Sequence, residues 1–258
     1  MNESCTVESG RVCVEVSGLR KSFGTSEILK GIDFGIRCGE IFVIMGPSGS
    51  GKSVLLKHLI GLERPTAGSV RIDGHEIDSP ELLSKYRIAM VFQSGALLSS
   101  LSVGENVGLY LREHRIHPPA EINRIVREKL AIVGLAGSEE KMPTELSGGM
   151  KKRVAIARAL VMDPQLILYD EPTSELDPLI SVTIGQEIVK MRERTHATSI
   201  VVTHDRDLGF GIADRIALIS GGRILTLGTP DEVRACDNPE VRTFLNASYQ
   251  PPEEADRT

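Results

Sequence analysis

A short glycine-rich segment constrains this chain more than any other feature of its sequence. Residues 46–53 read GPSGSGKS and match the pattern G-x-x-x-x-G-K-[ST]. The unbroken apolar run before it, Ile41 to Met45, predicts a strand buried on both faces, and residues 52–62 after it predict a helix. In that setting the glycines let N–H groups turn toward phosphate oxygens, while Lys52 and Ser53 offer a cation and a Mg²⁺ ligand. A glycine-rich turn without a ligand is the alternative, and the flanking strand and helix favour the phosphate site.

The rest of the chain predicts an α/β fold around this segment. Alternating runs predict half-buried antiparallel strands over 12–16 and 32–36 and a hairpin over 68–77, centred on Asp73-Gly74. From about 95 to 160 the strand signal disappears, and apolar residues at helical spacing predict a helical insertion. Strands and helices then alternate, over residues 166–169, 179–194, 199–203, 205–212 and 216–219, with Asp177 as N-cap and Pro178 at the first helical position of one helix. We therefore expect a mostly parallel core sheet with an N-terminal antiparallel β subdomain and a helical subdomain.

A second apolar run ends in two acidic residues, Asp170 and Glu171. The carboxyl ends of parallel strands form the edge at which open α/β sheets bind ligands. Asp170 would hold Mg²⁺ through its water shell, and Glu171 would polarise a water molecule that attacks a γ-phosphate. Paired acids at a strand end are often only solvated loop residues, but the phosphate loop in the same chain favours the catalytic interpretation.

Charge and hydropathy exclude several classes of protein. Lys and Arg total 30 against 35 Asp and Glu, a formal net charge of −5, which disfavours a dedicated DNA or RNA binder but not a local basic patch. The basic run 151–153 is interpreted as a solvated helix face. The longest apolar runs are far shorter than the roughly 20 residues that span a bilayer, so we expect this chain not to cross a membrane alone.

The cysteines and the N-terminal segment indicate a compartment. Cys5, Cys13, Cys38 and Cys236 include no C-x-x-C pair and are too sparse for a disulfide framework or an obvious zinc site. The N-terminal segment has neither the basic nor the apolar part of a secretory signal. Together these features predict a reducing cytosol.

A third motif resembles that of a known family. Residues 146–150 read LSGGM and continue into the run KKRVAIARAL. With the phosphate loop before it and Asp170-Glu171 after it, this segment resembles the signature of ABC-type ATPases, over about residues 12–245. The resemblance implies a P-loop NTPase fold of ABC type, with one ATPase domain over 10–246, a helical subdomain over about 95–160 and a flexible tail over 247–258. It also implies that the signature closes on ATP held by a second copy, in a head-to-tail dimer.

The same resemblance assigns roles to individual residues, and each has a plainer alternative. Phe23 would stack on adenine rather than fill the core, Gln93 would link Mg²⁺ and water to a membrane partner rather than be a surface glutamine, and His204 would orient Glu171 toward the γ-phosphate rather than be a satisfied strand-end histidine. Residues 174–177 resemble the loop that crosses the dimer interface. The predicted nucleotide-binding residues are Phe23, Gly46, Pro47, Ser48, Gly49, Ser50, Gly51, Lys52, Ser53 and Gln93; the metal ligands are Ser53, Gln93 and Asp170; the catalytic residues are Glu171 and His204; and the contacts to the partner's nucleotide are Ser147, Gly148, Gly149, Met150 and Asp177.

Two positions depart from the commonest pattern of the family. Met150 replaces the usual glutamine at the end of the signature, and Glu175 replaces a usual small residue in the dimer loop, where a carboxylate near two nucleotides would weaken closure by repulsion. Together with the segment that follows Gln93 and the C-terminal residues 237–245, Met150 is similar to the ATPases of Mla-type lipid transporters, also called toluene-tolerance or Mce-associated ATPases.

This resemblance implies a function in transport. Two copies would bind ATP and Mg²⁺ and drive a separate multispanning permease on the cytoplasmic face of the inner membrane. A STAS-domain subunit and an Mce-type lipid-binding protein are the further partners implied, phospholipid or a related lipid is the cargo, and no nucleic acid is expected. The alternatives are another cargo, such as an amino acid, an ion or a released lipoprotein, and a non-transport ABC ATPase that acts in DNA repair, translation or cluster assembly.

Overall fold

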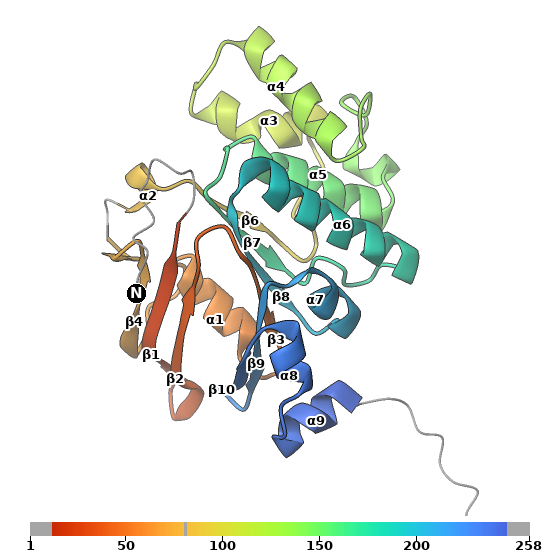
Figure 1. The fold of residues 1–258 in the computed structure, drawn as a ribbon. Coiled ribbons are helices and arrows are strands. Elements are labelled where there is room, and N and C mark those ends of the chain that lie inside the picture. The colour runs from red at the N-terminus through yellow and green to blue at the C-terminus, as the bar shows by residue number, and fades with distance from the viewer. Residues whose placement is uncertain (1–11, 80–81, 247–258) are drawn as a thin grey trace, which may run out of the picture.

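Two β-sheets and the helices that cover them form the fold (Figure 1). The computed structural model describes residues 12–79 and 82–246; the predicted tail, 247–258, and the first two residues of the predicted domain lie outside this range. The antiparallel sheet has the order β2-β1-β4-β5, and the core sheet has the order β10-β9-β3-β8-β7-β6. The strands are β1 (Val14–Phe23), β2 (Ser26–Ile36), β3 (Ile41–Met45), β4 (Ala67–Ile72), β5 (His75–Glu76), β6 (Ile88–Val91), β7 (Leu166–Asp170), β8 (Thr198–Thr203), β9 (Arg215–Ser220) and β10 (Arg223–Gly228).

The core sheet is parallel except at one edge. Strand β3 pairs in parallel with β8 and β9, β7 pairs in parallel with β8 and β6, and only β10 runs antiparallel, against β9. This confirms the predicted class of fold, an antiparallel N-terminal sheet beside a mostly parallel core sheet. The hairpin predicted around Asp73-Gly74 is the β4–β5 connection, where both turn residues have positive φ, 48° and 81°.

Helices cover both faces of the core sheet, and further helices pack outside them (Figure 1). They are α1 (Lys52–Leu59), α2 (Leu82–Lys85), α3 (Val103–Glu113), α4 (Pro119–Ile132), α5 (Gly148–Leu160), α6 (Pro178–Thr195), α7 (Arg206–Ile212), α8 (Pro230–Arg234) and α9 (Pro239–Asn246), with a 3-10 turn at Pro143–Glu145. Asp177 caps α6 as predicted, since its carboxylate accepts hydrogen bonds from the N–H groups of Leu179 and Ile180. Helix α1 ends earlier than predicted, because Gly61 just after it takes a left-handed conformation with φ 71°.

Alternate side chains of β3 enter two separate hydrophobic clusters. Ile41, Val43 and Met45 pack in the cluster that contains residues of α5 and α6. Phe42 and Ile44 pack in the other cluster, which contains residues of α1 and of the antiparallel sheet. Strand residues alternate between faces, so α1 and α5 lie on opposite faces of the core sheet.

One buried asparagine fixes the segment between β6 and α3. The side chain of Asn106 is fully buried, and its Nδ2 group donates to the carbonyl oxygens of Leu98, Leu101 and Ser102, each at 3.0 Å. Its Oδ1 accepts from the N–H of Leu98 at 2.8 Å. These contacts give the segment after Gln93 a defined path before α3 begins.

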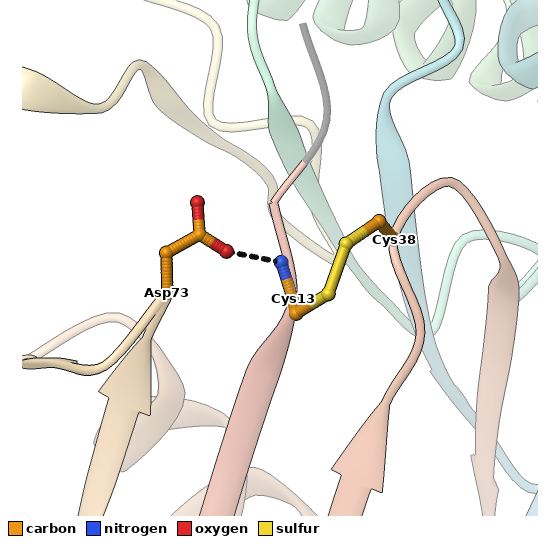
Figure 2. Close-up of side chains that lie close together, drawn as sticks. All are labelled: Cys13, Cys38 and Asp73. Carbon is orange, nitrogen blue, oxygen red and sulfur yellow. Dashed lines mark hydrogen bonds between the residues drawn. A yellow bond between two sulfur atoms is a disulfide. The ribbon is translucent and has the colours of Figure 1, made fainter. Parts of the chain in front are cut away.

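The structure corrects the expectation about the cysteines. Cys13 and Cys38, 25 residues apart in sequence, form a disulfide between the start of β1 and the turn after β2, with a Cα–Cα distance of 4.5 Å (Figure 2). Asp73 lies beside the pair and accepts a hydrogen bond from the N–H of Cys13 at 2.7 Å. The β1–β2 pairing brings the two cysteines together, and no local spacing in the sequence reports that.

Within the described residues, no helix combines the length and the apolar character required to cross a membrane.

Candidate active site

The phosphate loop joins the end of β3 to the start of α1. Gly46, Gly49 and Gly51 have φ values of 155°, 78° and 102°, which side chains rarely adopt. A Cβ at Gly46 would lie 2.1 Å from the carbonyl oxygen of Ile219, so this position has no room for one. No side chain caps the first turn of α1, which leaves its N–H groups for another acceptor. The loop therefore has the backbone geometry of an anion cradle.

Lys52 is buried inside this loop. Its Nζ donates to the carbonyl oxygens of Gly46 at 2.7 Å and Pro47 at 3.1 Å. Burial lowers the pKa of Lys52, while the nearby carboxylates of Glu171 and Asp170 act in the opposite direction. The ammonium group thus lies in the cradle beside both acids that the sequence analysis selected.

The two acids at the end of β7 have different surroundings. Oδ1 of Asp170 is buried and has no hydrogen-bond partner within the described residues. Burial raises the pKa of Asp170, with the charge of Glu171 as the next cause. Glu171 follows at a φ of 45°, a conformation that is rare for a residue with a side chain and that turns the chain at the sheet edge.

Glu171 and His204 are in direct contact. Oε2 of Glu171 accepts from Nδ1 of His204 at 2.9 Å, from the backbone N–H of His204 at 3.2 Å and from Oγ1 of Thr203 at 3.2 Å. Strands β7 and β8 are parallel neighbours that end at the same edge, which is why residues so far apart in sequence meet. The sequence analysis named Glu171 and His204 but missed Thr203, which holds the same oxygen.

The predicted contacts to a partner's nucleotide gather in a second place. Ser147 is the exposed N-cap of α5, and its Oγ accepts from the N–H of Met150 at 3.3 Å. The α carbons of Gly148 and Gly149 face the segment around Asp177, since added Cβ atoms would lie 3.3 Å from Leu176 and 2.6 Å from Ile180. We call Ser147, Gly148, Gly149, Met150 and Asp177 the signature patch. Because α5 and α1 lie on opposite faces of the core sheet, this patch is separate from the phosphate loop of the same chain.

Phe23 and Gln93 are both exposed. Phe23 ends β1 with 50% of its surface exposed, so the alternative of a core phenylalanine does not hold, and Nζ of Lys21 lies 4.8 Å from its ring centre. Gln93 is exposed just after β6 and borders a groove of about 1030 Å³ between α6 and α7, which Ser174 and His204 also line. The structure thus places Gln93 near the Glu171–His204 pair.

The expectation that residues 151–153 form a solvated helix face is wrong for Lys152. Its side chain is only 6% exposed. Its Nζ donates to the carbonyl oxygen of Gln93, to that of Glu171 at 3.3 Å and to Oγ of Ser174 at 3.2 Å. The helical period indicates that Lys152 is buried, because it lies three residues after Gly149 and three before Ala155, and both of these residues are buried.

Comparisons with known proteins agree with this geometry. A family model described as "ABC transporter" matches residues 29–174, more than half of the chain. The chain belongs to the ABC transporter family. It is an ATPase of that family, with the ATP-binding domain in the described fold.

Individual relatives are similar over most of this ABC ATPase. It is 44% identical over 239 residues to the "Probable ribonucleotide transport ATP-binding protein mkl" of Mycobacterium tuberculosis, covering 91% of this chain and 67% of that protein. It is 41% identical over 261 residues to the protein "TRIGALACTOSYLDIACYLGLYCEROL 3, chloroplastic" of Arabidopsis thaliana, covering 93% and 75%.

Solved structures share the fold. That of cbiO1 from Clostridium perfringens, described as part of the ABC transporter complex cbiONQ, superposes with a TM-score of 0.80 at 33% identity, covering 90% of this chain and 94% of that one. The cassette MJ0796, solved as a dimer bound to ADP and Pi, has a TM-score of 0.75 at 33% identity, covering 84% and 98%.

The residues of this ABC ATPase fit ATP with a divalent cation. The cradle has no room for a side chain at Gly46, and no side chain caps the first N–H groups of α1. The ammonium group of Lys52 lies within the loop. The buried, unpartnered oxygen of Asp170 is a hard ligand of the type that Mg²⁺ prefers, and the hydroxyl of Ser53 lies at the exposed first turn of α1.

Proposed function

We propose that this chain hydrolyses ATP with Glu171 as the residue that polarises the attacking water and His204 as the residue that orients Glu171. The observation that carries this proposal is the set of three donors, from Thr203 and His204, that hold one oxygen of Glu171 at the sheet edge. The other oxygen of Glu171 would accept a hydrogen bond from the attacking water. A carboxylate so held beside the phosphate loop can accept a proton from water as it attacks.

ATP and Mg²⁺ would be held by residues from four segments: β1, the phosphate loop with the start of α1, the segment after β6 and the end of β7. Lys52 and the backbone N–H groups of residues 46–53 would bind the phosphates, and the side chain of Phe23 would stack on adenine. Ser53, Gln93 and Asp170 would hold Mg²⁺, which supplies charge neutralisation of the phosphates when bound. Lys52 would exchange its two carbonyl partners for phosphate oxygens.

A Glu171→Gln variant tests this assignment. Glutamine keeps the size and the acceptor oxygen but cannot take a proton at pH 7, so we expect ATP binding to remain and turnover to fall at least about 100-fold. Glu193→Gln, at an exposed position of α6, is the matched control and should hydrolyse ATP like the parent chain. Undiminished hydrolysis by Glu171→Gln would overturn the role given to Glu171.

A second copy of the chain would complete each site. Helices α5 and α1, which begin at the signature patch and at the phosphate loop, lie on opposite faces of the core sheet, which supports contact between one copy's patch and the other copy's ATP. The MJ0796 cassette, similar in fold, is described as a dimer with bound nucleotide. A head-to-tail pair would bury two γ-phosphates, so that hydrolysis removes the anions that favour closure.

Phospholipid or a related lipid is the cargo that we favour. The support is the similarity of Met150 and the segment after Gln93 to Mla-type ATPases, and the Arabidopsis relative, whose name is that of a galactolipid. The partners would be a multispanning permease, a STAS-domain subunit and an Mce-type lipid-binding protein, with this chain at the cytoplasmic face of the inner membrane. The name of the mycobacterial relative supports a ribonucleotide as a second candidate cargo.

Affinity purification from membranes of the host, in mild detergent, tests the cargo. We expect mass spectrometry to find a stoichiometric permease with STAS and Mce-type subunits and enriched phospholipid. A different permease without lipid enrichment would overturn the lipid proposal but retain transport. Recovery with non-membrane proteins alone would overturn both.

A further inference from the structure

Lys152 joins three segments of the active site through one ammonium group. Its acceptors are the carbonyl oxygens of Gln93 and Glu171 and the hydroxyl of Ser174, which belong to the segment after β6, the end of β7 and the dimer loop. An ammonium group has three N–H donors, so the three contacts match its full capacity. A lysine that is only 6% exposed requires such partners, because an unpaired buried charge is costly.

Three carboxylates act on the charge of Lys152. Burial lowers the pKa of Lys152, and the carboxylates of Glu175, Glu171 and Asp170 oppose that shift, Glu175 most strongly. Glu175 has a φ of 63°, in the left-handed region, within the loop whose Ser174 bonds Lys152. The loop that Ser174 anchors to Lys152 thus carries an exposed carboxylate, Glu175, whose charge is opposite to that of Lys152.

Helix α5 holds the Gln93 segment at a second point. Arg158, six residues after Lys152 on α5, donates to the carbonyl oxygens of Gly95 at 2.8 Å and Ala96 at 2.6 Å. Ser147 caps the start of the same helix. Lys152 therefore connects the signature end of α5 to Gln93 and to the backbone of Glu171.

We infer that Lys152 is a positioning residue for ATP hydrolysis, which fixes Gln93 and Glu171 relative to the signature helix and to Ser174 in the dimer loop. This inference rests on the proposed function. Lys152 touches neither the phosphate loop nor the side-chain oxygens of Glu171 in the contacts above, so it acts through the residues it holds.

The experiment measures the ATP affinity and the kcat of Lys152→Met. Methionine keeps the length and apolar stem of lysine but removes the charge and the donors. We expect ATP affinity within about twofold of the parent chain and kcat lowered about tenfold or more, because a lost charge-assisted contact misplaces the catalytic groups.

Matched variants separate positioning from folding. Lys151→Met, the adjacent and half-exposed lysine, should keep the parent kcat, and Lys152→Arg should retain more activity than Lys152→Met. If the parent chain hydrolyses ATP but folded Lys152→Met matches it in kcat, the inference is overturned. No hydrolysis by the parent chain overturns the proposed function instead.

Discussion

Asn106 should be among the least replaceable side chains in the segment after Gln93. Asn106→Asp keeps the shape of the side chain but replaces the Nδ2 donor with a carboxylate oxygen. That oxygen would face the carbonyl oxygens of Leu98, Leu101 and Ser102, now 3.0 Å from Nδ2, at a position with no solvent exposure. The loss of two N–H donors costs about 1 kcal/mol each, and a buried carboxylate that faces three carbonyl oxygens adds more than this, so the variant should lose at least about 3 kcal/mol of unfolding free energy.

Thermal unfolding followed by circular dichroism at pH 7.5 without nucleotide measures this effect. For a chain of this size, 3 kcal/mol lowers the melting temperature by roughly 6–12 °C. Asn123→Asp is the control, since Asn123 is exposed on α4 and its Oδ1 only accepts a hydrogen bond from Arg112 at 3.3 Å. Equal melting temperatures for Asn106→Asp and the parent chain would refute the reasoning from this hydrogen-bond set.

Two further predictions concern stability. Cys38→Ser should lower the unfolding free energy by about 3.5 kcal/mol in oxidising buffer, the loop-closure value for a 25-residue separation, and should make no difference under dithiothreitol; a variant that melts like the oxidised parent would contradict the disulfide. Gly46→Ala should cost more stability than Gly49→Ala, because a Cβ at Gly46 would lie 2.1 Å from the Ile219 carbonyl oxygen whereas nothing lies within 4 Å at Gly49. Equal melting temperatures of these two variants would contradict the close packing of the loop.

Features encoded locally could be predicted from the sequence. The apolar run at 41–45 is β3, the Asp177-Pro178 pair starts α6, and Asp73-Gly74 turns between β4 and β5. Each depends on a few adjacent residues, whose backbone preferences and periodicity the sequence displays directly. The left-handed turn at Gly61, which ends α1 early, is also local but was not recognised.

Features that depend on pairing between distant segments could not be predicted in the same way. The contact of Glu171 with His204 was an expectation from family resemblance, and the register of β7 against β8 brings it about. The Cys13–Cys38 disulfide needs the β1–β2 pairing, which sequence spacing does not show. The composition of the basic run predicts a solvated face for Lys152, whereas the helical period of α5 places this one lysine on the buried side.

Complementation between two inactive variants tests the central claim most directly, that each ATP site is completed by the second copy. Lys52→Ala removes the loop cation, and Ser147→Arg blocks the signature patch, so each variant alone should be inactive. In a head-to-tail pair of one copy of each, one site keeps both an intact Lys52 and an intact Ser147. With random pairing of an equal mixture, the account predicts recovery of about a quarter of the parent ATPase activity. A mixture as inactive as its components, beside an active parent chain, would contradict the account.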